Sequence, residues 1–528
     1  MNNLQPDDTF HMQIKAFNQT FTLLLEPNRN LIHPNAMVRV KQADGSYKES
    51  SLLAKGDAVY RGYVLSSGSP HNAWLDGEAV SGLRTRNDFS FDDSLSGARV
   101  VLFRDAHNNI GLDGNFYYRG ETYNLKHTEA YRSSRRAEDP VLYARESLPE
   151  SLRTSRTIIY RVSDMVPVAY NGAQQQTRYR VRDGKSSEPA LQSAPATTCN
   201  AHRLPYNRVN HTRDTFMQGS ASGIRGDYHS LMYREASHDD ASRYWAHGFR
   251  FSRRDNSFDQ SQAALESGCT TSKKVLYMGV AADCTYITNY GSEDGARSQI
   301  LSNWNQVSAV YERQVNVQIG IIELQIESMS CPNSPGSDTA WNQQCSDTYT
   351  IERRLSDFSS WRAKRSNDDA GLWHLMTACA SGPEVGLAWR SVLCLSTSAR
   401  GDGNAVSSGT AVSATIPQEW KVVAHEIGHN FGAIHDCTKD NCNGKNGGTT
   451  DCCQCDSCNC DGKYIMNPSN PVSTDDFSVC SVRAICNGIK QSGSSCLHDP
   501  GERTTLSTAM CGNGIKEGDE ECDCGTGD

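Results

Sequence analysis

The chain has 528 residues, of which 37% are hydrophobic and 21% are charged, and its formal net charge is −9. At ~150 residues per domain this length predicts three or four domains, and no run approaches the ~18 apolar residues of a membrane span. Without a dominant basic patch, the charge argues against nucleic acid as the main partner. Of the 20 cysteines only Cys199 lies in the first half, and this density favours an oxidising, extracytosolic compartment over a cytosolic metal-binding protein.

Both ends of the sequence are unusual for an extracellular protein. Residues 1–8 have neither the basic nor the apolar region of a signal peptide. The last residue, Asp528, lies inside a cysteine-rich segment. We therefore expect a fragment of a secretory-pathway protein, which is either secreted or held at the cell surface as a type I membrane protein.

Short runs of alternating apolar and polar residues fill the region from 10 to 105, and glycine-rich stretches separate them. This pattern predicts a mostly β domain with hairpins, which we place at residues 1–131. The region has no clustered histidines or cysteines and no paired carboxylates. No catalytic site is therefore expected in it.

Residues 132–272 are polar and arginine-rich with weak periodicity, which favours an exposed, partly disordered connector. Two dibasic pairs in this region are candidate cleavage sites. The pair Arg253 and Arg254 lies close to the next change in composition, whereas Arg135 and Arg136 lie far upstream. We predict that a subtilisin-like proprotein convertase cuts at the later pair, with the earlier pair as the alternative.

The character of the sequence changes at Lys273, after which strand and helix patterns alternate over residues 273–497. Strands alternating with helices predict an α/β layer domain. Residues 498–528 follow it as a linker and a cysteine-rich segment. The predicted strands are residues 274–283, 315–326, 371–379 and 385–389, and the predicted helices are residues 298–311 and 350–365.

The next segment carries the residues with recognisable chemistry, in the order His425-Glu426-x-x-His429-x-x-Gly432-x-x-His435. Residues four apart share one face of a helix, so His425 and His429 can bind one metal ion. Gly432 lets the chain leave the helix, because glycine adopts a positive φ at low cost, and His435 can return as the third ligand. Glu426 lies beside the first ligand, where it can act as the general base on a metal-bound water.

Three protein ligands leave one coordination position open, which is typical of a catalytic rather than a structural zinc site. Zinc lowers the pKa of a bound water to ~7 and polarises a carbonyl, so the motif predicts peptide-bond hydrolysis. The alternative is a binding or adhesion protein on an inactive protease scaffold. Because all three histidines and Glu426 are present, the sequence favours the active enzyme.

The extended spacing of this motif is that of the metzincins, and several other segments resemble one of their branches. Asp436 after the third histidine resembles the adamalysin (reprolysin) branch, which includes the ADAM proteases. Residues 462–468 look like a Met-turn, and residues 386–389 resemble the edge strand that pairs with an extended substrate. Residues 511–525 closely resemble the start of a disintegrin domain, and residues 60–64 together with residues 81–83 loosely resemble an ADAM propeptide. The overall resemblance is to the TACE/kuzbanian-like branch and its fungal relatives.

This resemblance implies an α+β metzincin catalytic domain with a mixed twisted sheet, a zinc-motif helix and Met466 as the apolar floor beneath the zinc. It implies a propeptide that keeps the enzyme latent, and protein or peptide substrates at the cell surface or outside the cell, which the enzyme sheds or processes. It also implies Ca²⁺ binding in the disintegrin segment, where the residues alone favour an acidic solvated turn. The implied Ca²⁺ ligands are Asn513, Glu517, Glu520 and Asp523, with the backbone carbonyls of Met510 and Ile515.

A cysteine-rich insert separates Asp436 from the Met-turn, where this chain departs from its relatives. Cys455-x-x-Cys458 has the spacing of metal ligands, so a second metal site is one interpretation. We favour the other interpretation, in which disulfides staple a surface loop. Sixteen of the 20 cysteines lie between Cys269 and Cys496, an even number that can pair internally.

Cys199 is the odd cysteine that this pairing leaves over. A thiolate binds zinc strongly and would displace the catalytic water. We therefore predict that Cys199 is an inhibitory fourth ligand, a cysteine switch. The alternative is a stray or intermolecular cysteine.

Overall fold

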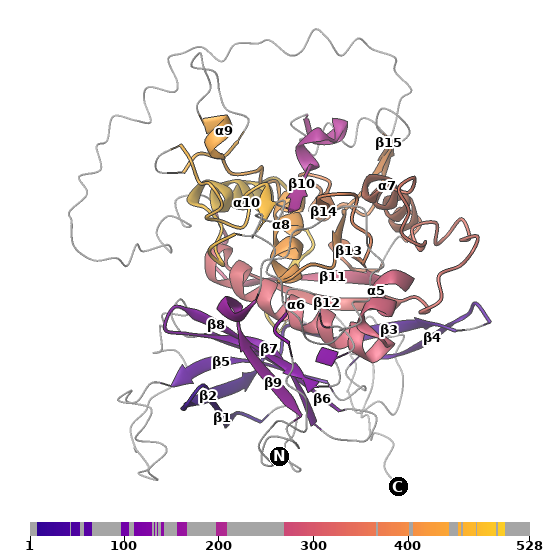
Figure 1. The fold of residues 1–528 in the computed structure, drawn as a ribbon. Helices are drawn as coiled ribbons and strands as arrows, with labels where there is room; N and C mark the ends of the chain where they lie inside the picture. Colours follow the sequence, from indigo (N-terminus) through magenta and orange to yellow (C-terminus); the bar gives the residue numbers. More distant parts are fainter. Residues whose placement is uncertain are drawn as a thin grey trace, which may run out of the picture.

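The computed structural model describes residues 8–42, 44–52, 57–65, 97–104, 110–128, 131–132, 135, 139–141, 156–165, 197–208, 269–365, 368–400, 405–442, 452–455, 458–470, 472–492 and 495–501. These residues form two large β-sheets. Helix α6 (Glu293–Val315) lies between the N-terminal sheet and the strands of the second sheet (Figure 1).

The N-terminal sheet has seven antiparallel strands in the order β1-β2-β5-β6-β7-β8-β9. One face of it is an apolar core, in which the rings of Phe21, Phe116 and Tyr123 pack together. This face explains the alternation in the sequence and confirms the mostly β prediction. The strands are β1 (Phe10–Ala16), β2 (Gln19–Pro27), β5 (Ala58–Leu65), β6 (Gly97–Arg104), β7 (Ile110–Tyr118), β8 (Glu121–His127) and β9 (Thr157–Arg161).

The second sheet is mixed and has the order β18-β10-β14-β17-β13-β11-β12-β3-β4, with β19 paired to β11. Strands β11, β12, β13 and β17 run parallel, and β14 is antiparallel to β17. The mixed sheet predicted for the catalytic region is therefore confirmed. Its strands are β3 (Ile32–Lys41), β4 (Tyr47–Ser51), β10 (Thr197–Cys199), β11 (Lys274–Ala282), β12 (Val317–Ile326), β13 (Leu372–Thr377), β14 (Glu384–Ala388), β17 (Thr410–Ala414), β18 (Ser469–Asn470) and β19 (Leu497–His498), and β15 (Ala399–Arg400) pairs with β16 (Val406–Ser407) apart from it.

N-terminal segments extend this sheet at both edges, which the sequence patterns did not predict. Hairpin β3–β4 continues the sheet beyond β12, and β10 pairs with β14 at the other side. The expected connector thus supplies β10 here and β9 to the N-terminal sheet. Both strands have five residues or fewer, and neither shows the alternating burial that a sequence pattern would reveal.

Three of the helices begin at a capping side chain. Asp283, Ser292 and Thr350 each accept a hydrogen bond from the backbone N–H three residues on, at the starts of α5, α6 and α7. No helix in the described ranges is both long and apolar enough to cross a membrane. Besides α6, the helices are α5 (Cys284–Tyr290), α7 (Ile351–Arg362), α8 (Glu419–Phe431), α9 (Lys439–Cys442) and α10 (Val479–Ser492), with 3₁₀ turns at Val162–Asp164, Ala201–Arg203 and Pro205–Arg208.

All sixteen cysteines between Cys269 and Cys496 are paired, which confirms the internal pairing expected from their even number. Cys455 and Cys458 both lie in disulfides, so the interpretation as a second metal site is wrong. Cys199 is the free cysteine of the described residues, and it is buried. The pairs are Cys269–Cys486, Cys284–Cys331, Cys345–Cys379, Cys394–Cys496, Cys437–Cys452, Cys442–Cys458, Cys453–Cys480 and Cys455–Cys460.

Candidate active site

Helix α8 positions two of the motif histidines. Ile427 on its apolar side packs in the catalytic core. His425 and His429, four residues apart, share a different face of the helix. The helix ends at Gly432, whose φ of 115° lies in the left-handed region where a side chain would be strained.

The three histidines converge on one point. Nε2 of His435 lies 3.1 Å from Nε2 of His429 and 3.2 Å from Nε2 of His425. The other ring nitrogens face backbone carbonyls, with His425 Nδ1 2.7 Å from the Ile465 oxygen and His429 Nδ1 2.9 Å from the Ala433 oxygen. Because a carbonyl oxygen only accepts, each of these Nδ1 atoms donates. The Nε2 lone pairs of both rings are then free to bind a metal ion.

Burial keeps these imidazoles neutral. It lowers the pKa of His425 to about 4. It also lowers the pKa of His429 and of His435 well below the usual value, and the neighbouring rings add to the effect. The neutral imidazole is the form that binds metal ions.

Glu426 is fully buried beside the histidines. Its Oε1 has no hydrogen-bond partner among the described residues. A Cβ added at Gly386 on β14 would lie only 2.2 Å from this oxygen, so a glycine at that position makes room for the carboxylate. Burial raises the pKa of Glu426 well above its usual value, which suits a group that must take up a proton.

Cys199 brings a sulfur atom to the same point. In β10 it lies opposite Gly386 of β14, and the two strands run parallel. Its Sγ is 3.7 Å from Nε2 of His429 and 3.7 Å from Oε2 of Glu426. Burial and the Glu426 carboxylate raise the pKa of this thiol, and a bound cation would oppose both effects.

These side chains form a donor set that fits a tetrahedral metal ion. Within the described part of the chain, the ligand atoms of Cys199, His425, His429 and His435 lie within 4.8 Å of one another, and all four residues are buried. For bonds of ~2.0–2.3 Å, a tetrahedral zinc ion requires nitrogens ~3.3 Å apart and a sulfur ~3.6 Å from them. The separations given above are close to these values.

Met466 lies against the helix that carries the histidines. It is fully buried, and a Cβ added at Gly428 of α8 would come within 2.7 Å of its Sδ. The Met466 carbonyl accepts a hydrogen bond from the Asp436 N–H at 2.9 Å. The turn thereby contacts both the helix and the segment after the third histidine, and its role as the floor beneath a zinc ion stays a prediction.

The cysteine-rich insert supports the third histidine. The Cys453 N–H donates to the His435 carbonyl at 2.9 Å. Cys453 is in turn bonded to Cys480 on α10. The sequence predicted a stapled loop here but gave no sign that the loop would hold a candidate ligand in place.

Asn207, which sequence reasoning missed, occupies the edge of β14. Its Nδ2 donates to the Ala388 carbonyl at 2.8 Å, and its Oδ1 accepts from the Arg390 N–H at 2.7 Å. The preceding residue, Tyr206, packs edge-on against Trp389 with ring centroids 5.7 Å apart. Both residues lie in the segment 197–207 that carries Cys199, but nothing in the sequence indicates that they contact the edge of β14.

Several predicted site residues lie outside the described residues. They are the candidate cleavage residues Arg253 and Arg254 and the candidate Ca²⁺ ligands Asn513, Glu517, Glu520 and Asp523. Their roles stay predictions.

Family models match two regions of the chain. A model of the reprolysin family propeptide matches residues 2–65. A model of the metallo-peptidase family M12 matches residues 271–478, which include the three histidines and Met466. The first region contains β1, β2, β3, β4 and β5, and the second contains the strands and helices around the site.

Curated relatives extend the similarity over nearly the whole chain. "Disintegrin and metalloproteinase domain-containing protein B" of Aspergillus fumigatus is 30% identical over 534 residues, which cover 98% of this chain and 61% of that protein. "Zinc metalloprotease mde10" of Schizosaccharomyces pombe is 33% identical over 280 residues, covering 48% of this chain and 52% of that protein. "Zinc metalloproteinase-disintegrin-like atrase-A" of Naja atra is 28% identical, with 48% and 36% covered. The chain therefore spans less than two thirds of the length of these relatives.

Proposed function

Because this chain belongs to the reprolysin family of metallopeptidases, we propose that it is the latent precursor of a zinc endopeptidase, with zinc held by His425, His429 and His435. The observation that carries the proposal is the convergence of three neutral imidazoles beside the buried carboxylate of Glu426. A structural zinc site would have no use for an unpartnered carboxylate oxygen at that position.

Zinc bound by the three histidines would polarise the scissile carbonyl and lower the pKa of a water molecule to ~7. In this proposal Glu426 takes a proton from the attacking water, whose oxygen bonds to the carbonyl carbon. The carbon–nitrogen bond then breaks, and Glu426 passes the proton to the leaving amine. The raised pKa of Glu426 favours the uptake of this proton.

The substrate in this proposal is an extended peptide that takes the place of β10 along β14. The Ala388 carbonyl and the Arg390 N–H, now bonded to the Asn207 side chain, would then be available to a substrate backbone. Such pairing orients a peptide without reading its sequence, because main-chain groups are the same in every peptide. It fits protein or peptide substrates, and we propose shedding or processing of cell-surface or extracellular proteins.

Latency in this proposal comes from Cys199, whose sulfur takes the coordination position next to Glu426. We further propose that a proprotein convertase cuts at Arg253-Arg254 and so allows the N-terminal region to leave. The eight disulfides among the described residues suit the oxidising secretory pathway, with the protein secreted or anchored at the cell surface. In the disintegrin segment, Asn513, Glu517, Glu520 and Asp523 are the proposed Ca²⁺ ligands.

Glu426→Gln tests the proposed chemistry, because it keeps the shape of the side chain and removes the base. In chain cut after Arg254 and freed of its N-terminal region, we expect the cleavage rate of a quenched peptide library to fall by about 10²–10⁴-fold. Metal analysis should find the same zinc content as in the unchanged protein. Peptide cleavage at the unchanged rate, or cleavage that a chelator does not stop, would refute the zinc mechanism.

A further inference from the structure

The β12 edge of the catalytic sheet binds hairpin β3–β4 from the N-terminal region. Strand β3 pairs in parallel with β12, with Val38 opposite Leu324 and Val40 opposite Ile326. Ala36 and Val38 are fully buried, and both belong to the apolar core of the catalytic region rather than to that of the N-terminal sheet. The hairpin therefore belongs to the catalytic sheet, whereas the strands on either side of it in the sequence, β2 and β5, belong to the N-terminal sheet.

Tyr47, the first residue of β4, makes the most specific contact of the hairpin. Its hydroxyl donates to Glu327 Oε1 at 2.5 Å and accepts from Gln325 Nε2 at 3.1 Å. The side chains of Arg39 and Lys41 lie over its ring, with their cationic groups 5.1 and 4.3 Å from the ring centroid. Burial raises the pKa of Tyr47, and the Glu327 carboxylate adds to this, so the hydroxyl stays a donor.

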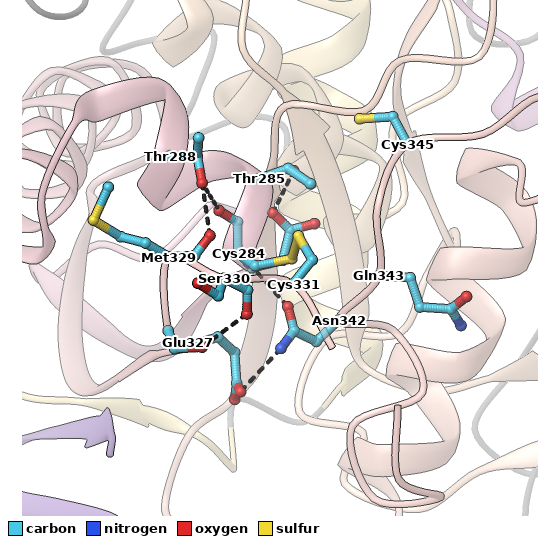
Figure 2. The surroundings of a disulfide bond; sticks show 12 residues. Cys284, Thr285, Thr288, Glu327, Met329, Ser330, Cys331, Asn342, Gln343 and Cys345 are labelled. Atoms are coloured by element: carbon cyan, nitrogen blue, oxygen red, sulfur yellow. Dashed lines mark hydrogen bonds between the residues drawn. A yellow bond between two sulfur atoms is a disulfide. The ribbon is translucent and has the colours of Figure 1, made fainter. Parts of the chain in front are cut away.

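Glu327, which accepts the hydrogen bond from Tyr47, is held in place by other residues of the catalytic region. Asn342 donates from Nδ2 to Glu327 Oε2 at 3.1 Å, and its Oδ1 accepts from the Cys284 N–H at 2.9 Å. Figure 2 shows this bridge beside the Cys284–Cys331 disulfide, which ties the loop after Glu327 to the start of α5. These contacts do not involve the N-terminal region, so the catalytic region holds Glu327 and Asn342 through bonds of its own.

Two further contacts across this edge are polar. Asn30 donates to Gln318 Oε1 at 2.7 Å, and Arg39 lies 3.6 Å from Glu323. Strands β14 and β12 are the first and last of five neighbouring strands in the order β14-β17-β13-β11-β12. With ~4.8 Å between neighbouring strands, the two edges are ~19 Å apart, so the hairpin contact needs neither zinc nor Cys199.

We infer that the β12 edge, with Gln325, Glu327 and Asn342, is a second binding surface of the catalytic region, whose occupant is hairpin β3–β4. This surface retains the N-terminal region after the chain has been cut, independently of the thiol contact at the candidate metal site. The inference rests on the proposed function only in taking the cut between the two regions as the activating event. Activation then requires dissociation of the hairpin as well as cleavage.

The test uses full-length chain with Cys199→Ala and a site-specific protease sequence in place of Arg253 and Arg254. After the cut, we expect the two pieces to elute together in gel filtration. Tyr47→Phe and Glu327→Gln should each raise the dissociation constant of the two pieces about tenfold, as for loss of a hydrogen bond to a charged group. The double variant should be little weaker than either single one, because both changes remove the same contact.

Tyr118→Phe is the matched control, since it removes a hydroxyl from a ring that packs against Phe21 within the N-terminal sheet. It should leave the dissociation constant unchanged. The inference is overturned if the pieces separate once Cys199 is replaced, or if Tyr47→Phe binds as tightly as Tyr118→Phe. The readout is binding and involves no hydrolysis, so an inactive enzyme would refute the proposed function without affecting this result.

Discussion

At the scale of single residues, the site combines the residues of the histidine motif with two residues, Cys199 and Asn207, that lie outside it. His425, Glu426 and His429 come from one helix, and their spacing alone predicted their shared face. Cys199 reaches them from more than 200 residues away, and Asn207 follows it at the same strand edge. A free thiol at Cys199 could be predicted from the number of cysteines, because the sixteen between Cys269 and Cys496 can pair among themselves. Asn207 could not be predicted, since its role depends on backbone groups of β14 that the sequence does not display.

Asn207→Ala should loosen the segment that carries Cys199. It removes hydrogen bonds to the Ala388 carbonyl and from the Arg390 N–H, and it leaves both backbone groups without that partner in a buried site. With a net cost of about 1–2 kcal/mol, we expect Cys199 in uncut chain to react with a thiol reagent roughly tenfold faster. Arg203→Ala, at an exposed position in the same segment, is the control. Equal alkylation rates for the two variants would contradict the role of Asn207.

At the scale of elements, most of the catalytic sheet could be predicted, because its buried strands and amphipathic helices have strong periodic signals. The predicted helix 298–311 lies within α6, and the predicted strand 315–326 corresponds to β12 (Val317–Ile326). The partners of each strand could not be predicted in the same way. The sequence of hairpin β3–β4 has the same alternating pattern as the other hairpins of the N-terminal region. Only tertiary packing assigns this hairpin to the catalytic sheet.

The end of α8 determines where the third histidine lies. Gly432 has a φ of 115°, and its N–H bonds back to the His429 carbonyl at 2.8 Å. Gly432→Ala should therefore cost about 1–3 kcal/mol of unfolding free energy and move His435. We expect a lower midpoint in denaturant and faster loss of zinc to a chelator. Gly336→Ala, where a Cβ meets nothing within 4 Å, should change neither, and equal behaviour of the two variants would show that the cap is not required.

At the scale of the whole molecule, the N-terminal sheet and the catalytic region meet across α6 through polar contacts and through buried apolar residues, since Val59 and Val101 belong to the apolar core of the catalytic region. One buried ion pair among them joins Arg297 to Asp57 at 2.7 Å. Other pairs across this interface are Asn115–Gln306 at 2.5 Å, Lys126–Gln299 at 2.6 Å and Arg61–Glu312 at 3.2 Å.

Acid should destabilise the catalytic region through His374. This residue of β13 is fully buried with one ring nitrogen 2.8 Å from Ser413 Oγ, and burial lowers its pKa from 6.5 to about 3. Between pH 6.5 and pH 3, His374 is therefore protonated in the unfolded chain and neutral in the folded chain. The stability that neutral His374 contributes is complete above pH 6.5 and is lost progressively as the pH falls towards 3.

Between pH 6 and pH 4, this one residue should lower the unfolding free energy by about 1.4 kcal/mol per pH unit. Denaturant unfolding at several pH values, with the disulfides intact, measures the slope. His374→Gln should remove that part of it, whereas His11→Gln at an exposed position on β1 should not. An unchanged slope in His374→Gln would contradict the assignment.

The central claim is that uncut chain holds zinc with three imidazole nitrogens and the Cys199 sulfur. X-ray absorption at the zinc edge of purified full-length chain tests it most directly. We predict one sulfur at ~2.3 Å and three nitrogens at ~2.0–2.1 Å, with the sulfur signal absent from Cys199→Ala. A zinc site with only nitrogen and oxygen ligands in the uncut protein, or a sulfur signal that survives Cys199→Ala, would contradict the account.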